Sequence, residues 1–210
     1  MLTKSRLAII LSQLRQFSSP KLLSEQYTTD SETAAGTLWL AYMNGDIKGK
    51  ALADFGCGTG ILGIGCLLLG AKKVYFVDDD KAAISIAAAN LNKIRGICKF
   101  SGKAELLCSD INEFSKKADV VIQNPPFGTK TLHSDREFLF KAFQTADVVY
   151  SFHKASTDRF VHALCSDSGF VVTHKVSYDM ALKRTQAFHK RDMHRIGVAL
   201  YRMERRLGKR

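Results

Sequence analysis

The sequence 51-ALADFGCGTGILGIG-65 joins an apolar run to a series of closely spaced glycines. Residues 51–55 form a short, mostly apolar run, as in a buried strand. Gly56, Gly58 and Gly60 follow this run, and the apolar segment after them predicts a helix over 60–70. Glycine allows a tight turn and leaves room for a ligand, because it has no Cβ. A strand, a glycine-rich turn and a helix therefore predict an α/β unit with a ligand at the carboxyl end of the strand.

The same alternation continues along the chain. Further strands are predicted at 73–77, 104–108, 118–123, 147–152, 170–176 and 196–202, and further helices at 4–17, 33–43, 81–94, 136–146 and 156–167. Strands that alternate with helices predict an α/β fold with a mostly parallel seven-stranded sheet and helices on both faces. We expect a helical segment over 1–45 packed on one domain over 46–203, followed by a basic tail over 204–210.

Composition narrows the class of protein. The 210 residues are 46% hydrophobic and 24% charged, which suits one buried core and excludes disordered and collagen-like chains. The longest apolar run, 61–71, is about half a bilayer span, and the patch at 7–11 is too short for a signal peptide. We therefore expect no membrane span and a cytoplasmic location, with the nucleus or nucleolus as a further compartment.

The spacing of the cysteines and histidines does not suggest a metal site. The five cysteines are odd in number and form no CxxC pair, so neither a disulfide framework nor a zinc site is predicted, and the six histidines lack metal-ligand spacing.

The net charge of +11 is concentrated near the C-terminus. Residues 181–210 contain ten lysines and arginines against Asp192 and Glu204, which favours a polyanionic partner. Phe188 and Tyr201 lie among these charges, and aromatic rings can stack on bases, so nucleic acid is the expected partner. The alternative is a solvated tail.

Acidic residues follow two more strands. Asp78 is placed to accept hydrogen bonds from ribose hydroxyls, Asp80 to cap the next helix, and Asp110 either to accept from an adenine amino group or to form a turn. The glycine-rich turn at 56–60, called the glycine loop below, has no phosphate-binding lysine, which argues against ATP hydrolysis. Its G-x-G-x-G spacing suits adenosine carrying an amino acid better than NAD.

The motif 124-NPPF-127 follows the strand predicted at 118–123. The two prolines fix the backbone angle φ at two successive positions and remove two N–H donors, which leaves a rigid rim of carbonyl acceptors. Asn124 and the Pro125 carbonyl can both accept from an exocyclic amine, and Phe127 can stack on the base. The alternative is a rigid turn without chemistry.

The motifs "DFGCGTG", "VDDD" and "NPPFGTK" resemble those of class I S-adenosylmethionine-dependent methyltransferases, which have a Rossmann-like fold. With "PKLLSEQYTT" (20–29), "VYSFHK" (149–154) and "FHKR" (188–191), the chain is similar, from Pro20 to Arg202, to the methyltransferase-like protein 5 family. That family forms N6-methyladenosine in small-subunit ribosomal RNA.

The resemblance implies roles for particular residues. Cofactor contacts are implied for Gln26, Tyr27, Thr29, Asp54, Gly56, Gly58, Gly60, Asp78, Asp110 and Asn124. The catalytic rim that holds the target base is Asn124, Pro125, Pro126 and Phe127. RNA contacts are assigned to Lys130, Lys183, Arg184, His189, Lys190 and Arg191. Thr28 stands where the family often has proline.

Other acceptors stay open on the residues alone, because an asparagine and a carbonyl can hold several amines. Guanine N2, DNA adenine and protein glutamine are the enzymatic alternatives, and a non-catalytic RNA-binding module is another.

A partner is also implied by the resemblance. In its usual sheet order, residues 104–108 form an edge strand with Ile97, Phe100, Leu106 and Leu107 around it. An exposed edge favours strand addition, here by a small zinc-binding activator subunit in a heterodimer. The alternative is that these side chains pack against the protein's own helices.

Overall fold

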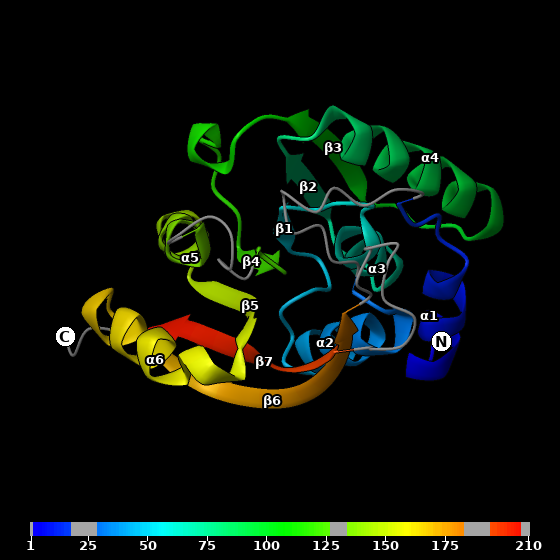
Figure 1. The fold of residues 1–210 in the computed structure, drawn as a ribbon. Coiled ribbons are helices and arrows are strands. Elements are labelled where there is room, and N and C mark those ends of the chain that lie inside the picture. Colours follow the sequence, from blue (N-terminus) through cyan, green and yellow to red (C-terminus); the bar gives the residue numbers. More distant parts are fainter. Residues whose placement is uncertain (1, 18–28, 127–133, 183–193, 207–210) are drawn as a thin grey trace.

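The computed structural model describes residues 2–17, 29–126, 134–182 and 194–206 (Figure 1). One seven-stranded sheet has the order β3-β2-β1-β4-β5-β7-β6. The first five strands run parallel, and β7 runs antiparallel to both β5 and β6. The mostly parallel sheet, and the edge position of its third strand, are therefore confirmed.

The elements follow the predicted alternation. The strands are β1 Ala51–Phe55, β2 Lys73–Asp78, β3 Lys103–Cys108, β4 Val120–Gln123, β5 Val148–Lys154, β6 Phe170–Leu182 and β7 His194–Arg205. The helices are α1 Lys4–Ser12, α2 Ser31–Met43, α3 Ile61–Leu68, α4 Lys81–Ile97, α5 Ser134–Thr145 and α6 Asp158–Asp167, with 3-10 turns at Ile111–Glu113 and Ala155–Thr157. No helix among these described segments is long and apolar enough to span a membrane.

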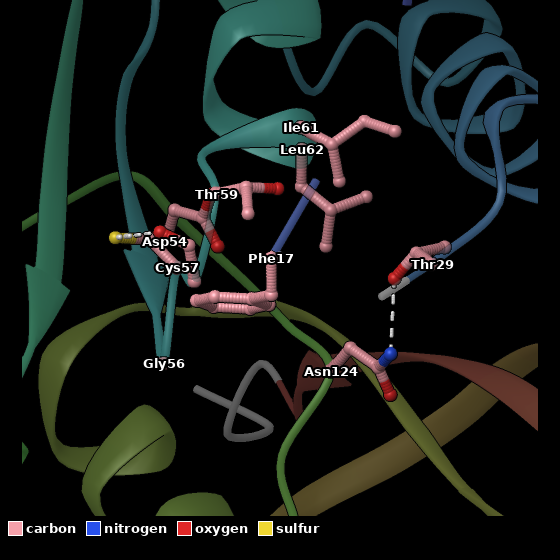
Figure 2. A pocket seen from close by; sticks show the side chains of 10 residues that line it. Phe17, Thr29, Asp54, Gly56, Cys57, Thr59, Ile61, Leu62 and Asn124 are labelled. Carbon is pink, nitrogen blue, oxygen red and sulfur yellow. Dashed lines mark hydrogen bonds between the residues drawn. The ribbon is translucent and has the colours of Figure 1, made fainter. Parts of the chain in front are cut away.

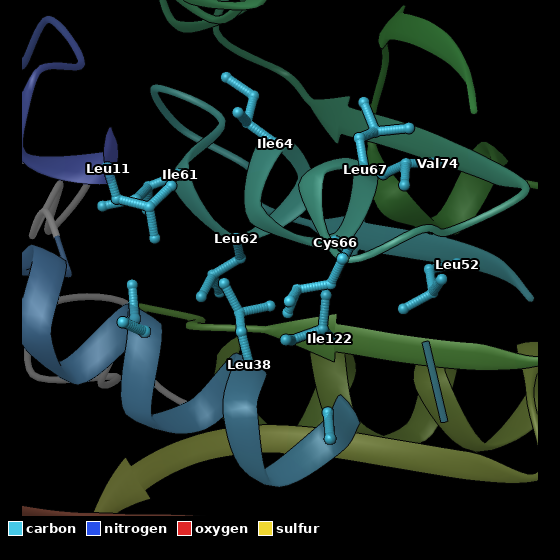
Figure 3. Close-up of a cluster of buried hydrophobic side chains, with 14 of the residues drawn as sticks. Leu11, Leu38, Leu52, Ile61, Leu62, Ile64, Cys66, Leu67, Val74 and Ile122 are labelled. Carbon is cyan, nitrogen blue, oxygen red and sulfur yellow. The ribbon is translucent and has the colours of Figure 1, made fainter. Parts of the chain in front are cut away.

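Two apolar cores cover the two faces of the sheet. Residues of α1, α2, α3 and α4 pack on one face, and Figure 3 shows α2 and α3 meeting there around Leu38 and Leu62. Residues of α5 and α6 pack on the other face, where the rings of Phe143 and Phe170 stack with centroids 4.1 Å apart. The helices on both faces are thus as expected.

The glycines of α3 allow it to lie between the sheet and α2. A Cβ on Gly63 would come within 2.3 Å of the Phe76 ring in β2, and a Cβ on Gly65 within 2.2 Å of Leu38 in α2. These close approaches position α3 against β2 and α2, and its first residue, Ile61, directly follows the glycine-rich turn at 56–60.

Helix α1 is shorter than the prediction of 4–17. It ends at Ser12, and the backbone of Arg15 turns away to hydrogen-bond with the Asn90 side chain of α4. A tertiary partner therefore replaces the last helical turn, and Phe17 leaves the helix pattern. Strands β6 and β7 are longer than predicted, because they pair with each other as a long antiparallel ribbon that reaches Leu182 and His194.

Part of the basic segment is committed inside the fold. Arg202 is buried, and its Nε lies 2.9 Å from Asp46 Oδ2, while Arg205 pairs with Asp147. Tyr201 is fully buried and donates to Asp158 at 2.7 Å. The interpretation of Tyr201 as a base-stacking ring is therefore wrong, and the free charge of the segment is smaller than its composition suggests.

Candidate functional site

A pocket lies at the carboxyl ends of β1 and β4, as the sheet topology predicts (Figure 2). It is lined by the glycine loop, the start of α3, the strand end at Asn124 and two residues of the N-terminal region. The lining residues are Phe17, Thr29, Asp54, Gly56, Cys57, Gly58, Thr59, Ile61, Leu62 and Asn124. Five of them, Thr29, Asp54, Gly56, Gly58 and Asn124, were predicted to contact a cofactor.

The glycine loop is a turn that requires glycine. Gly56, Gly58 and Gly60 have φ values of +63°, +54° and +85°, and Gly60 caps α3. A side chain is disfavoured at such angles, and a Cβ on Gly56 would also approach Phe138 to 3.1 Å. The bare backbone of this loop forms the floor of the pocket, which fits a ligand that approaches closely.

Asp54 lies at the end of β1 and is almost fully buried. Its Oδ2 accepts from Gly63 N at 2.8 Å, which ties the strand to the first turns of α3. Burial, aided by the nearby Asp78 and opposed by the Gly63 N–H, raises the pKa of Asp54 to about 8. A cationic ligand beside this carboxyl would favour its ionised form.

Asn124 joins the strand end to the N-terminal region. Its Nδ2 donates to Thr29 Oγ1 at 2.9 Å, and the dashed line in Figure 2 marks this bond. Its Oδ1 is buried and has no hydrogen-bond partner among the described residues. A buried acceptor without a donor costs about 1–3 kcal/mol, so this oxygen is set to receive a donor from a ligand. The neighbouring Pro125 is buried and Pro126 half-buried.

Asp78 and Asp110 do not line this pocket. Asp78 Oδ2 accepts from Gly58 N at 2.8 Å, so its carboxylate holds the glycine loop, and burial raises its pKa. Asp110 is exposed, and its Oδ1 caps the short turn after β3 by accepting from Asn112 N. The predicted cap at Asp80 is confirmed by a bond from Ala82 N.

Apart from neighbours within the glycine loop and the start of α3, two residues at the site were missed in the sequence. Phe17 lines the pocket, and a Cβ on Gly58 would lie 3.7 Å from its ring. Asn90 is fully buried; it accepts from Arg15 N at 2.8 Å and donates to Arg15 O at 3.0 Å and to Thr59 O at 2.9 Å. One side chain therefore ties the N-terminal region to the glycine loop. A polar residue on the apolar stripe of α4 was the signal for it.

A buried polar chain lies beneath Asn124. Gln123 Nε2 donates to Ser151 Oγ at 3.0 Å, and Ser151 Oγ lies 2.8 Å from His153 Nε2. Burial lowers the pKa of His153 to about 4, so its ring is neutral at pH 7. These three side chains join the end of β4 to β5, and none of them is among the described residues that line the pocket.

No described residue of the pocket is an activated nucleophile. Cys57 is the thiol in the pocket, and burial together with Asp54 and Asp78 raises its pKa well above the ordinary value. No cluster of three metal-ligating side chains occurs in the parts of the chain that the structure describes. The arrangement can hold an adenosine-like cofactor on the glycine floor and an amine at Asn124.

The remaining predicted site residues lie outside the described residues. They are Gln26, Tyr27, Phe127, Lys130, Lys183, Arg184, His189, Lys190 and Arg191, together with the aromatic residue Phe188.

Comparisons with known proteins agree with this geometry. The family model for ribosomal protein L11 methyltransferase matches residues 29–125. The zebrafish (Danio rerio) rRNA N6-adenosine-methyltransferase METTL5 is 35% identical over 86% of this chain and 88% of its own length. A crystal structure from Pyrococcus horikoshii, of a candidate RNA methyltransferase, is 43% identical, covers 99% of this chain and 100% of its own, and has a TM-score of 0.89.

More distant structures share the fold alone. Magnesium protoporphyrin IX methyltransferase from Synechocystis, crystallised with S-adenosylmethionine, is 16% identical with a TM-score of 0.63 over 83% of this chain and 79% of its own. The fold is that of class I S-adenosylmethionine-dependent methyltransferases, and the chain belongs to the methyltransferase-like protein 5 family of rRNA N6-adenosine-methyltransferases.

Proposed function

We propose that this protein transfers the methyl group of S-adenosylmethionine to N6 of an adenosine in small-subunit ribosomal RNA. The observation that carries the proposal is the buried Oδ1 of Asn124, which has no partner within the described part of the chain and lies at the end of β4 in the same pocket as the glycine loop. Family membership selects adenosine over guanine N2, DNA adenine and protein glutamine, and an enzyme over a binding module.

The residues present fit the cofactor. Gly56 and Gly58 leave room for close approach, and Asp54 offers a carboxyl for a cationic group. S-adenosylmethionine supplies an electrophilic methyl group on a positively charged sulfur. Asp78 holds the loop through Gly58 N and can still accept from ribose hydroxyls, since each carboxylate oxygen has a second lone pair. The adenine contact of Asp110 stays a prediction.

Asn124 and Pro125 would orient the amine of the target base. Each of its two N–H groups needs an acceptor, and Asn124 Oδ1 and the Pro125 carbonyl provide two. Such bonds draw the nitrogen lone pair out of conjugation with the ring and aim it at the methyl carbon. As the N–C bond formed, the bond from sulfur to the methyl carbon would break, S-adenosylhomocysteine would leave, and the acidified nitrogen would lose one proton to water. Orientation and acceptor placement therefore supply most of the catalysis and no strong base is needed.

The test is Asn124→Ala. We expect methyl transfer to small-subunit rRNA to be abolished while the cofactor dissociation constant changes by no more than a few-fold, because Asn124 serves the acceptor base. Calorimetry measures cofactor binding, and mass spectrometry of digested nucleosides identifies N6-methyladenosine. A variant with near-normal turnover would refute the role of Asn124, and N2-methylguanosine from the wild type would refute the choice of base.

We also propose that a small zinc-binding activator subunit adds a strand to β3. This strand is the sheet edge and pairs with β2 along its whole length. Lys103 N and Ser109 N donate inward to Lys72 O and Asp78 O, so by alternation the N–H groups of Ala104, Leu106 and Cys108 point outward. Ile97 is 57% exposed beside this edge.

Not every apolar residue near the edge is free to meet a partner. Phe100 and Leu106 are half-buried against one core, and Leu107 is half-buried against the other. A charge at Leu106 would therefore disturb the protein's own core as well as a complex. The outward N–H groups are the better target for a test.

Proline removes an N–H, so Ala104→Pro with Cys108→Pro should abolish association with the activator. The matched control, Ala104→Ser with Cys108→Ser, retains both donors and should associate normally. Co-purification after co-expression measures the complex, and cofactor binding reports folding. A complex of unchanged affinity with the proline variant would contradict strand addition at β3.

The RNA contacts assigned to Lys130, Lys183, Arg184, His189, Lys190 and Arg191 remain part of the proposal. An rRNA substrate favours the cytoplasm, the nucleus or the nucleolus as the location of the protein, which imaging of a tagged chain would test.

A further inference from the structure

Lysines gather at the amino ends of the parallel strands, at the end of the sheet opposite to the pocket. We call this group the lysine edge; it consists of Lys48, Lys50, Lys72, Lys73, Lys103, Lys116 and Lys117. Lys73 and Lys103 begin β2 and β3, while Lys50 directly precedes β1. All except the half-buried Lys73 are exposed.

Backbone hydrogen bonds hold these lysines side by side. Lys72 N donates to Lys50 O at 2.8 Å, and Lys103 N donates to Lys72 O at 3.0 Å, so three neighbouring strand starts each present a lysine. The turn that carries Lys48 is fixed by a bond from Gly49 N to Gly70 O at 2.9 Å. The cluster therefore belongs to the rigid sheet.

Few acids neutralise the lysine edge. Glu105 pairs with both Lys73 and Lys116, and these two lysines lower its pKa. Asp119 accepts from Ala51 N at 2.8 Å. No ion pair joins Lys48, Lys50, Lys72 or Lys103 to an acid within the described part of the chain. Asp46 and Asp147, which precede β1 and β5, pair with Arg202 and Arg205 instead, so Glu105 and Asp119 are the acids set against the seven lysines in the described residues.

Such an arrangement is unfavourable without a counter-charge. Like charges on adjacent strands repel, and a solvated face would tolerate the lysines better if they were spread out. A phosphate backbone supplies closely spaced negative charge and relieves the repulsion, with release of its own counterions. The chemistry of the lysine edge is therefore that of a polyanion site.

We propose that the lysine edge binds the phosphate backbone of the structured RNA that presents the target adenosine. This inference rests on the proposed function and adds a second contact surface to it. Strands of five or six residues at about 3.3 Å per residue separate the lysine edge from the pocket by roughly 15–20 Å. Only a folded RNA, or a long one, can contact both ends of the sheet at once.

The test compares two triple charge reversals. Lys48→Glu, Lys50→Glu and Lys72→Glu change the lysine edge, and Lys4→Glu, Arg6→Glu and Arg159→Glu change the net charge equally at exposed positions elsewhere. Binding to a small-subunit rRNA transcript is measured over a series of salt concentrations. Each lost phosphate contact flattens the slope of log K against log salt by about 0.7–0.9, so we expect a loss of about 2 from the first variant beyond that from the second.

A neutral variant and a short substrate complete the experiment. Lys48→Gln, Lys50→Gln and Lys72→Gln should lose the same slope, because the contacts and not the added negative charge are responsible. Methylation of a short single-stranded oligonucleotide, and cofactor binding, should be unchanged in all variants. Equal slopes for the lysine-edge and control variants would overturn the inference, as would loss of oligonucleotide methylation in the Gln variant. Absence of N6-methyladenosine with the wild type would instead overturn the proposed function.

Discussion

Asn90 offers the sharpest test of how the site is assembled. It is fully buried on α4 and makes three hydrogen bonds, two to the backbone of Arg15 and one to Thr59 O. Asn90→Ala removes all three. We expect a loss in the free energy of unfolding and a weaker cofactor site, because the glycine loop and the segment that carries Phe17 both lose their tie.

The magnitude follows from these contacts. Water can reach the partly buried Arg15 groups, so each of those two bonds is worth about 1 kcal/mol, whereas the Thr59 carbonyl is left buried at a cost of about 1–3 kcal/mol. The higher helix propensity of alanine returns about 0.5 kcal/mol. The expected loss is about 2.5–4.5 kcal/mol, with a cofactor affinity about tenfold lower.

Asn92→Ala is the matched control, since Asn92 lies exposed on the same helix and gains the same helix propensity. Urea titration gives the free energy of unfolding, and calorimetry gives the cofactor dissociation constant. Hydrogen exchange at residues 13–17 should increase in the Asn90 variant alone. If the two variants have equal stability and cofactor affinity, Asn90 does not join the N-terminal region to the site.

Three further predictions concern charges in and below the pocket. Asp78→Ala should weaken S-adenosylmethionine binding by about 2 kcal/mol, with the exposed Asp79→Ala as control in calorimetry; equal affinities would place the ribose contact elsewhere. Because the pKa of Asp54 is about 8, cofactor affinity should rise between pH 6 and pH 8 as the carboxyl ionises, with proton release on binding. Asp54→Asn should remove this pH dependence, and a cofactor affinity of the wild type that does not change with pH would contradict the role of Asp54. The pKa of His153 is lowered from 6.5 to about 4, so the folded state binds its proton less well than the unfolded chain, and the free energy of unfolding should fall by up to about 3 kcal/mol as the pH drops from 6.5 to 4. His153→Gln should lessen that fall, and an identical pH profile for the variant would exclude His153 as its cause.

Much of the fold was readable in the sequence because it rests on local patterns. The alternation of apolar runs with helical periodicity predicts the parallel sheet, and Gly56, Gly58 and Gly60 stand where a turn of positive φ requires them. Asn124 was also found, since motifs at strand ends meet at one edge of a parallel sheet, whereas Asp54 and Thr29 were implied by the family resemblance.

A local pattern can mark a residue such as Asn90 as unusual, but which distant segments contact each other follows from the tertiary structure. Phe17 fits an apolar helix stripe in the sequence, yet it lines the pocket because Asn90, 75 residues beyond Arg15, captures the backbone and ends the helix early. Tyr201 stands among basic residues and is nevertheless buried, because β7 inserts between β5 and β6. The lysine edge likewise gathers residues from separate strand starts, which are distant along the chain and adjacent only through backbone hydrogen bonds between strands.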